Sequence, residues 1–232
     1  MPRRPETVVA MNKPLPVVVL ISGRGSNLKA ILDAIADGEL PVEIRAVISN
    51  RPDAPGLQRP TLLGIRTIVI DHVRYSSRRA FESVLQTTID ALEPGLLVLA
   101  GFMRILAPEF VTHYRGRILN IHPSLLPEFP GINTHQRVLD AGKRESGATV
   151  HFVTPEMDGG PAILQARVPV LANDDAGLLA SRVLEQEHRI LPMAILWFAM
   201  GRLRLDATGV VFFDGAPLIR PRLLLPGSQE PT

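Results

Sequence analysis

The sequence predicts an α/β fold: a mostly parallel, twisted sheet with helices on both faces, followed by a mixed-sheet C-terminal part. Two observations lead to it. Short apolar runs of strand character alternate with segments of helical periodicity through the first half of the chain, and such βαβ alternation builds a parallel sheet. Two further strand-like runs then follow each other across a glycine-rich loop, with no helix between them. The second part is therefore expected to differ in strand arrangement.

The first part contains five expected strands, separated mostly by helices. The strands are Val17–Ile21, Ile44–Ser49, Ile68–Ile70, Leu96–Ala100 and Ile118–Ile121. Apolar residues recur with helical spacing from Asn27 to Gly38 and from Ser76 to Leu92, which predicts two amphipathic helices. The helix expected after the second strand is weakened by Pro60.

The second part is expected to contain three strands and one long helix. Ala148–Val153 and Ile163–Val170 have strand character, and the helix runs from Asp174 to Met200 with a kink at Pro192. The segment Val210–Gly215 predicts a last strand that ends in a hairpin-type turn. In a parallel sheet, the site is expected in the crevice at the carboxyl ends of the strands.

The composition excludes several classes of protein. The 232 residues include 25 basic and 23 acidic side chains, for a formal net charge of +2, so no nucleic-acid partner is inferred. The absence of cysteine excludes disulfides and thiolate chemistry and fits the reducing cytoplasm. No apolar run is long enough to cross a membrane. The histidines show no metal-ligand spacing, so no metal is expected.

Asn120 and His122 are the most informative residues. They alternate with Ile121 at the end of an expected buried strand, so both point to the same face, and Pro123 stops the strand directly after them. A buried parallel strand is normally apolar throughout. The two residues are either hydrogen-bonded polar residues of the core or a catalytic pair, since an amide and an imidazole together can stabilise a developing oxyanion.

The segment Gly23–Asn27 lies between a strand and a helix, where backbone N–H groups and the helix dipole favour an anion. Gly25, Ser26 and Asn27 are the candidate phosphate ligands. The alternative is a tight turn in which Ser26 is the helix N-cap. Leu28 occupies the third glycine position of a dinucleotide fingerprint, so a monophosphate is the better prediction.

Two acidic residues also stand out. Asp158 lies in a loop between two expected strands, where it is either a functional carboxylate or an ordinary turn residue before glycine. Glu187 falls on the apolar face of the long helix. A carboxylate there has either a buried partner or access to a cleft, because a lone buried charge is costly.

Four segments carry a resemblance to a known family: Ile21–Leu28, Leu99–Leu106, Leu119–Pro127 and Met157–Pro161. They occur in this order, at similar spacing, in the phosphoribosylglycinamide formyltransferases, folate-dependent enzymes of purine biosynthesis. The resemblance extends from Val17 to Leu218. It implies a Rossmann-like formyltransferase fold and the transfer of a formyl group from 10-formyltetrahydrofolate, the co-substrate, to the amine of glycinamide ribonucleotide.

By motif position, the resemblance implies that Asn120 and His122 stabilise the oxyanion of a tetrahedral intermediate, while Asp158 fixes the imidazolium and helps to move the proton. Gly25, Ser26 and Asn27 would take the substrate phosphate. Glu187, together with Gly101 and Pro123, would bind the amine and ribose part. The folate pocket would comprise Met103, Arg104, Ile105, Leu106, Val111, Thr154, Pro155, Glu156 and Met157.

The resemblance also implies the organisation of the chain. Residues 15–220 would form a single formyltransferase domain, with a phosphate-binding half (15–115) and a folate-binding, catalytic half (116–220). The residues themselves, and not the resemblance, predict a flexible extension at 1–14 and a tail at 221–232. The family includes dimers, so a homodimer is possible. Arg24 stands where the family often has asparagine, and Pro60 and Pro155 are unusual for the family.

Other functions remain open. Methionyl-tRNA formyltransferase and formyltetrahydrofolate deformylase share the Asn120 and His122 motif, but each carries a further domain for which this length leaves no room. A non-catalytic nucleotide-binding module would bind phosphate at the Gly25–Asn27 turn without turnover. An NAD-dependent dehydrogenase fits less well, because the third glycine of the fingerprint is missing and no acidic residue closes the second strand directly after Ser49.

Overall fold

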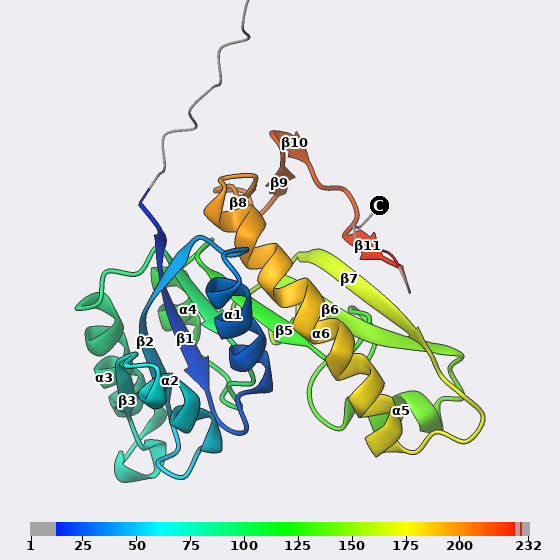
Figure 1. Ribbon diagram of the computed structural model, residues 1–232, viewed down its shortest axis with the longest axis horizontal. Helices are drawn as coiled ribbons and strands as arrows, with labels where there is room; N and C mark the ends of the chain where they lie inside the picture. Colours follow the sequence, from blue (N-terminus) through cyan, green and yellow to red (C-terminus); the bar gives the residue numbers. More distant parts are fainter. Residues whose placement is uncertain (1–12, 226–227, 229–232) are drawn as a thin grey trace, which may run out of the picture.

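An eight-stranded sheet forms the centre of the computed structural model, which describes residues 13–225 and Ser228 (Figure 1). Its strands are β1 (Leu15–Ile21), β2 (Val42–Ser49), β3 (Thr67–Val69), β4 (Leu96–Leu99), β5 (Ile118–His122), β6 (Glu145–Phe152), β7 (Ala162–Pro169) and β11 (Arg222–Leu224). They lie in the order β11-β7-β6-β5-β4-β1-β2-β3. Strand β6 is antiparallel to both neighbours and every other pair is parallel. The predicted mostly parallel sheet with a mixed second part is confirmed.

Helices cover both faces of this sheet, as predicted. One face packs against α1 (Ser26–Ala36) and α6 (Ala176–Ala199), and the other against α3 (Arg78–Asp90) and α4 (Pro108–His113). Residues Val17–Ile21 of β1 are all fully buried, and alternate residues belong to the two separate cores. This double cover explains why the strand is apolar throughout.

The long helix α6 lies beside α1 over the first of these faces (Figure 1). Asp175 caps its start by accepting a hydrogen bond from Leu178 N at 2.7 Å. The helix continues through Pro192 to Ala199 as one element, and the kink expected at this residue stays a prediction. Its buried side chains, Glu187 among them, face the sheet and α1.

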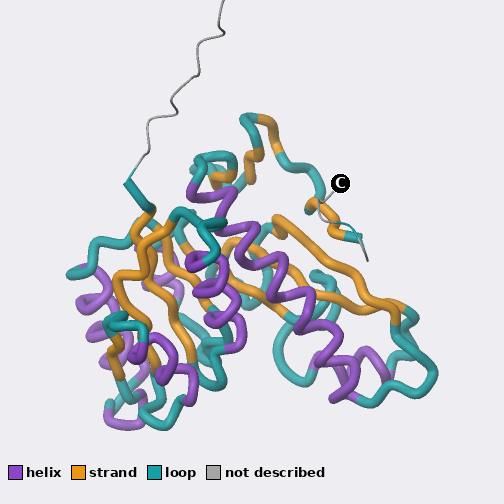
Figure 2. Tube along the Cα trace, viewed as in Figure 1, coloured by secondary structure: helices purple, strands orange, loops and turns teal. Residues whose placement is uncertain are grey.

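Several short elements were not predicted. They are α4, α5 (Thr134–Asp140), the strands β8 (Leu203–Leu205) and β10 (Ala216–Pro217), the edge strand β11 and the 3₁₀ turns Pro55–Leu57 and His72–Arg74. The predicted hairpin is confirmed: β9 (Val211–Phe213) turns through Asp214 and Gly215, both with positive φ, into β10. With β8 these strands form a small antiparallel sheet, seen as the orange strands beyond the end of α6 (Figure 2).

The helix after β2, which was expected to be weakened by Pro60, is short: α2 spans only Gln58–Leu62, with Pro60 in its first turn. Most of the extension expected at residues 1–14, and part of the tail expected at 221–232, lie outside the described residues. Within the tail, Arg222–Leu224 pairs in parallel with β7 and adds an edge to the sheet. No helix among the described residues is long and apolar enough to span a bilayer.

Candidate active site

A cavity of about 610 Å³ opens at the carboxyl ends of β4 and β5. Two segments complete its wall: residues 131–136, which include the first turn of α5, and the loop at 153–158. Every residue expected in the folate pocket lines it: Met103, Arg104, Ile105, Leu106, Val111, Thr154, Pro155, Glu156 and Met157. Asn120, His122, Asp158, Gly101 and Pro123 line it as well. The cavity thus brings together residues that are far apart in the sequence.

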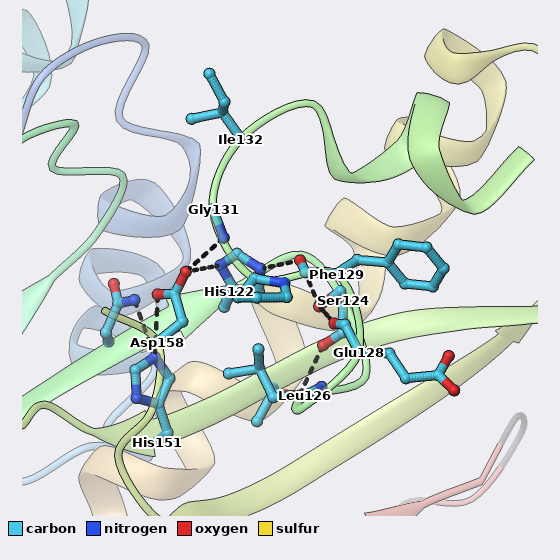
Figure 3. A network of polar contacts seen from close by, with 12 residues as sticks. His122, Ser124, Leu126, Glu128, Phe129, Gly131, Ile132, His151 and Asp158 are labelled. Atoms are coloured by element: carbon cyan, nitrogen blue, oxygen red, sulfur yellow. Dashed lines mark hydrogen bonds and ion pairs between the residues drawn. The ribbon is translucent and has the colours of Figure 1, made fainter. Parts of the chain in front are cut away.

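His122 lies at the end of β5, with only 5% of its surface exposed. Its Nδ1 atom is 3.4 Å from Asp158 Oδ2, and its Nε2 atom is 2.9 Å from the carbonyl oxygen of Phe129 (Figure 3). Both ring nitrogens therefore face oxygen acceptors. This arrangement suits the imidazolium, because only the protonated ring carries a hydrogen on each nitrogen.

Asp158 reaches His122 because its loop turns back over the sheet. Its backbone adopts a left-handed conformation with φ of 52°, directly before two glycines. The same carboxylate oxygen that faces His122 accepts a hydrogen bond from Gly131 N at 2.8 Å (Figure 3). Asp158 thus fixes the imidazole and the loop at residue 131 together, which the sequence spacing alone could not show.

His151 holds the side chain of Asn120. The two residues are cross-strand partners in the antiparallel pair β5–β6, and Asn120 Nδ2 lies 3.1 Å from His151 Nε2. Burial lowers the pKa of His151, so the neutral ring donates from Nδ1 to Phe152 O at 2.9 Å. Its Nε2 is then left to accept from Asn120. Sequence reasoning missed His151 as a partner of Asn120, because only the strand register brings the two side chains together.

The phosphate candidates lie at the start of α1. Gly25 occupies the N-cap position with φ of 72°, so the alternative in which Ser26 caps the helix is wrong. No side chain caps this turn, and the first helical hydrogen bond runs from Lys29 N to Gly25 O at 2.8 Å. Within the described residues, the first N–H groups of α1 remain available to an anion.

Asn27 and Glu187 form a buried pair between α1 and α6. Asn27 Nδ2 donates to Glu187 Oε2 at 2.6 Å, and Glu187 is 8% exposed. Burial raises the pKa of Glu187, while the hydrogen bond from Asn27 opposes that shift. Glu187 was expected to have either a buried partner or access to a cleft, and the structure shows the buried partner, Asn27. Neither residue lines the large cavity, so the structure places the phosphate candidates beside it rather than in it.

Gly56 packs against the turn Gly23–Asn27, the candidate phosphate site that is called the phosphate turn below. Its N–H donates to Gly23 O at 3.0 Å, and a Cβ atom at Gly56 would lie only 2.9 Å from Gly25 Cα and from Gly23 O. The 3₁₀ turn that contains it therefore packs backbone against backbone. Sequence reasoning missed Gly56, since a glycine in a proline-flanked turn carries no sign of its neighbour in space.

Among the described residues, no cluster of three or more histidine, aspartate or glutamate side chains is arranged to hold a metal ion. The network around His122, Asp158, Asn120 and His151 is suited to charge stabilisation. Its donors and its carboxylate converge at one end of the cavity, where an oxyanion and a transferred proton can both be accommodated.

Known proteins resemble this chain over most of its length. Residues 15–195 match the family model described as formyl transferase. The phosphoribosylglycinamide formyltransferase of Escherichia coli is 53% identical over 202 residues, which cover 87% of this chain and 95% of that protein. The protein of the same name from Haemophilus influenzae is 44% identical over the same shares of each chain. A solved phosphoribosylglycinamide formyltransferase from Coxiella burnetii superimposes with a TM-score of 0.84 at 54% identity, covering 88% of this chain and 96% of that one.

Proposed function

The chain belongs to the phosphoribosylglycinamide formyltransferase family, and from this we propose which residues carry its reaction. It transfers the formyl group of 10-formyltetrahydrofolate to the amine of glycinamide ribonucleotide in purine biosynthesis. The proposal rests on one observation: His122 contacts Asp158, and both residues line the same cavity as Asn120. The products are formylglycinamide ribonucleotide and tetrahydrofolate.

The reaction in this proposal is a direct transfer without a covalent enzyme intermediate. The amine nitrogen of the ribonucleotide attacks the formyl carbon, a C–N bond forms, and the formyl oxygen takes up the negative charge. Collapse of this tetrahedral intermediate breaks the bond between the formyl carbon and N10 of the folate. The proton lost by the amine ends on N10, so the two substrates and two products balance without another reactant.

Asn120 is the amide donor to the oxyanion. One of its two N–H groups is directed to His151 Nε2, which leaves the second free to face the cavity. His151 thereby sets which edge of the amide is presented. A donor fixed before the substrate binds costs no reorganisation in the transition state.

His122 supplies positive charge next to the intermediate. The contacts with Asp158 and Phe129 O hold its ring on both sides. For Nε2 to donate to the oxyanion directly, the ring would exchange Phe129 O for the substrate oxygen. Asp158 keeps the imidazolium oriented in either case, and it is the group through which the proton passes from the amine towards N10.

The two substrates would approach from neighbouring regions. The ribonucleotide phosphate binds the free N–H groups at Gly25, Ser26 and Asn27, and Glu187 contacts the glycinamide end. Gly101 and Pro123, which line the cavity, contact the amine and ribose part of the ribonucleotide together with Glu187. The folate enters the 610 Å³ cavity, whose wall includes the apolar side chains of Met103, Ile105 and Met157.

Two finer expectations accompany this assignment. We place the enzyme in the cytoplasm, because a chain without cysteine forms no disulfides and needs no oxidising compartment. A homodimer is also expected from the family resemblance. Sedimentation velocity at several protein concentrations would test it, because a single monomeric species throughout would contradict the expectation.

Product formation in the presence of both substrates tests the function. Purified protein is mixed with 10-formyltetrahydrofolate, and the deformylated folate is followed by absorbance with and without glycinamide ribonucleotide. Production that requires the ribonucleotide supports the transferase. Production without it would indicate a deformylase. Binding of either ligand without any turnover would favour a nucleotide-binding module.

A further inference from the structure

Ser22 joins the two loops that face the two substrates. It follows β1 directly and opens the turn towards Gly25, yet its backbone N–H donates to Gly101 O at 3.1 Å. Its hydroxyl oxygen accepts a hydrogen bond from Met103 N at 2.8 Å. The phosphate turn is thus tied at one residue to the segment 101–106, which forms part of the cavity wall.

Asn50 fixes the Ser22 hydroxyl. Ser22 Oγ donates to Asn50 Oδ1 at 2.5 Å, and the two residues are only 6% and 3% exposed. Because a hydroxyl has one hydrogen, donation to Asn50 leaves an oxygen lone pair for the N–H of Met103. His72 holds Asn50 in turn: its Nδ1 atom is 2.9 Å from Asn50 O and 3.2 Å from Asn50 Nδ2.

These contacts run across the carboxyl edge of three neighbouring strands. Asn50 follows β2, Ser22 follows β1, and Met103 lies in the loop after β4, in the sheet order β4-β1-β2. The register of β1 with β4 ends at Leu20 and Leu99. The bonds of Ser22 therefore extend the alignment of these strands into the loops, where ligands of parallel sheets bind.

We propose that Ser22, held by Asn50, is a positioning residue that shapes the folate cavity by fixing the backbone at Met103. The inference deepens the function above, because it takes 10-formyltetrahydrofolate as the occupant of that cavity. Ser22 does not line the cavity, so its effect passes through the loop. Without the hydroxyl, the Met103 N–H and Asn50 Oδ1 would both lack their buried partner.

The chain offers a closely matched control in Ser49. Its hydroxyl at the end of β2 is fully buried, donates to Arg51 O at 2.8 Å and accepts from Arg51 N at 3.0 Å. It therefore has the same number of hydrogen bonds as the Ser22 hydroxyl. The Ser49 hydroxyl makes no hydrogen bond with the cavity loops. An effect that comes only from lost stability should therefore be similar when either serine is replaced by alanine.

The experiment compares Ser22→Ala with Ser49→Ala in the full chain. Loss of a buried hydrogen-bond partner predicts a rise of about tenfold in the KM for 10-formyltetrahydrofolate in Ser22→Ala. The KM for glycinamide ribonucleotide should change far less. Ser49→Ala should leave both constants close to those of the wild type, although its thermal unfolding temperature falls as well.

Amide exchange at Met103 gives a second readout that needs no turnover. Hydrogen–deuterium exchange of peptides covering residues 101–106 should accelerate in Ser22→Ala and stay unchanged in Ser49→Ala. Asn50→Ala removes the acceptor of the Ser22 hydroxyl and should raise the folate KM by a smaller factor. If Ser22→Ala does not fold, Asn50→Ala tests the inference through the residue that holds the Ser22 hydroxyl.

Unchanged exchange at Met103 in a folded Ser22→Ala protein would overturn the inference, as would equal rises in KM for the two substrates. A wild-type protein without ribonucleotide-dependent turnover would instead overturn the proposed function. In that case, the exchange at Met103 would still decide whether Ser22 holds this loop.

Discussion

The side-chain amide of Asn27 donates to the carboxylate of Glu187 at 2.6 Å and joins the first turn of α1 to the middle of α6. Both residues are more than nine-tenths buried. Asn27 Oδ1 has no hydrogen-bond partner within the described part of the chain. A carboxylate assigned to the amine of the substrate is therefore in direct contact with a residue assigned to its phosphate.

Replacing Glu187 by Gln should impair binding of the ribonucleotide. The neutral amide can still accept from Asn27, but it no longer offers a charge to the amine end of the substrate. Hydrogen bonds to charged groups contribute about 1.5–3 kcal/mol, so we expect the KM for glycinamide ribonucleotide to rise at least about tenfold. Initial rates with each substrate varied in turn would measure this change. Equal rises for the ribonucleotide and the folate would assign Glu187 a structural role instead.

The same variant should alter how stability depends on pH. Burial raises the pKa of Glu187 above its ordinary value of 4.5. Between the pKa of the unfolded state and the higher pKa of the folded state, the folded protein therefore binds more protons than the unfolded protein. The contribution of Glu187 to stability is complete below the ordinary pKa and is lost as pH rises through the folded pKa. Glu187→Gln should therefore gain stability relative to the wild type as pH rises through this window. Urea unfolding at several pH values would test it, since a constant difference would contradict the raised pKa.

Substitution of either proposed oxyanion donor, Asn120 or His122, should abolish most turnover while leaving the fold intact. For Asn120→Ala or His122→Ala, we expect kcat to fall by about two to three orders of magnitude, as for the loss of one oxyanion-hole donor. Circular dichroism would verify that each variant is folded before its single-turnover rate is measured. A rate near that of the wild type in either variant would remove that residue from the catalytic role.

His151 should act through Asn120 and not independently of it. In His151→Ala, the Asn120 amide loses the acceptor that orients it, so we expect kcat to fall by about tenfold, the equivalent of one hydrogen bond. Combining this change with Asn120→Ala should cost no more than Asn120→Ala alone, because the group that His151 positions is already missing. Fully additive losses in the double variant would give His151 a separate role.

The shared orientation of Asn120 and His122 and most of the sheet could be predicted from the sequence, for a common physical reason. A strand alternates its faces, so Asn120 and His122 had to point the same way, and buried parallel strands are recognisable as apolar runs. The position of Asp158 could not be predicted from spacing, because it depends on how the loop after β6 turns back. The structure now places its carboxylate 3.4 Å from the imidazole of His122.

The elements and partners that were missed depend on tertiary contacts. Helices α4 and α5 have only six and seven residues, too few for a clear helical period. Strand β11 has three residues, and its pairing with β7 is its one sign of strand character. The role of His151 could be recognised only from its register with Asn120. The role of Gly56 could be recognised only from its packing against the phosphate turn.

Gly56→Ala should weaken binding of the ribonucleotide without any contact to it. The new Cβ atom would lie 2.9 Å from both Gly25 Cα and Gly23 O, so the phosphate turn or the 3₁₀ turn must shift. Overpacking of this kind typically costs about 1–3 kcal/mol, and we expect the KM for glycinamide ribonucleotide to rise about tenfold. Inhibition by inorganic phosphate should weaken in parallel, because phosphate tests the same turn alone. The KM for 10-formyltetrahydrofolate is the internal control, since Gly56 does not line the folate cavity. If phosphate inhibition stayed the same while the ribonucleotide KM rose, the phosphate would have to bind elsewhere.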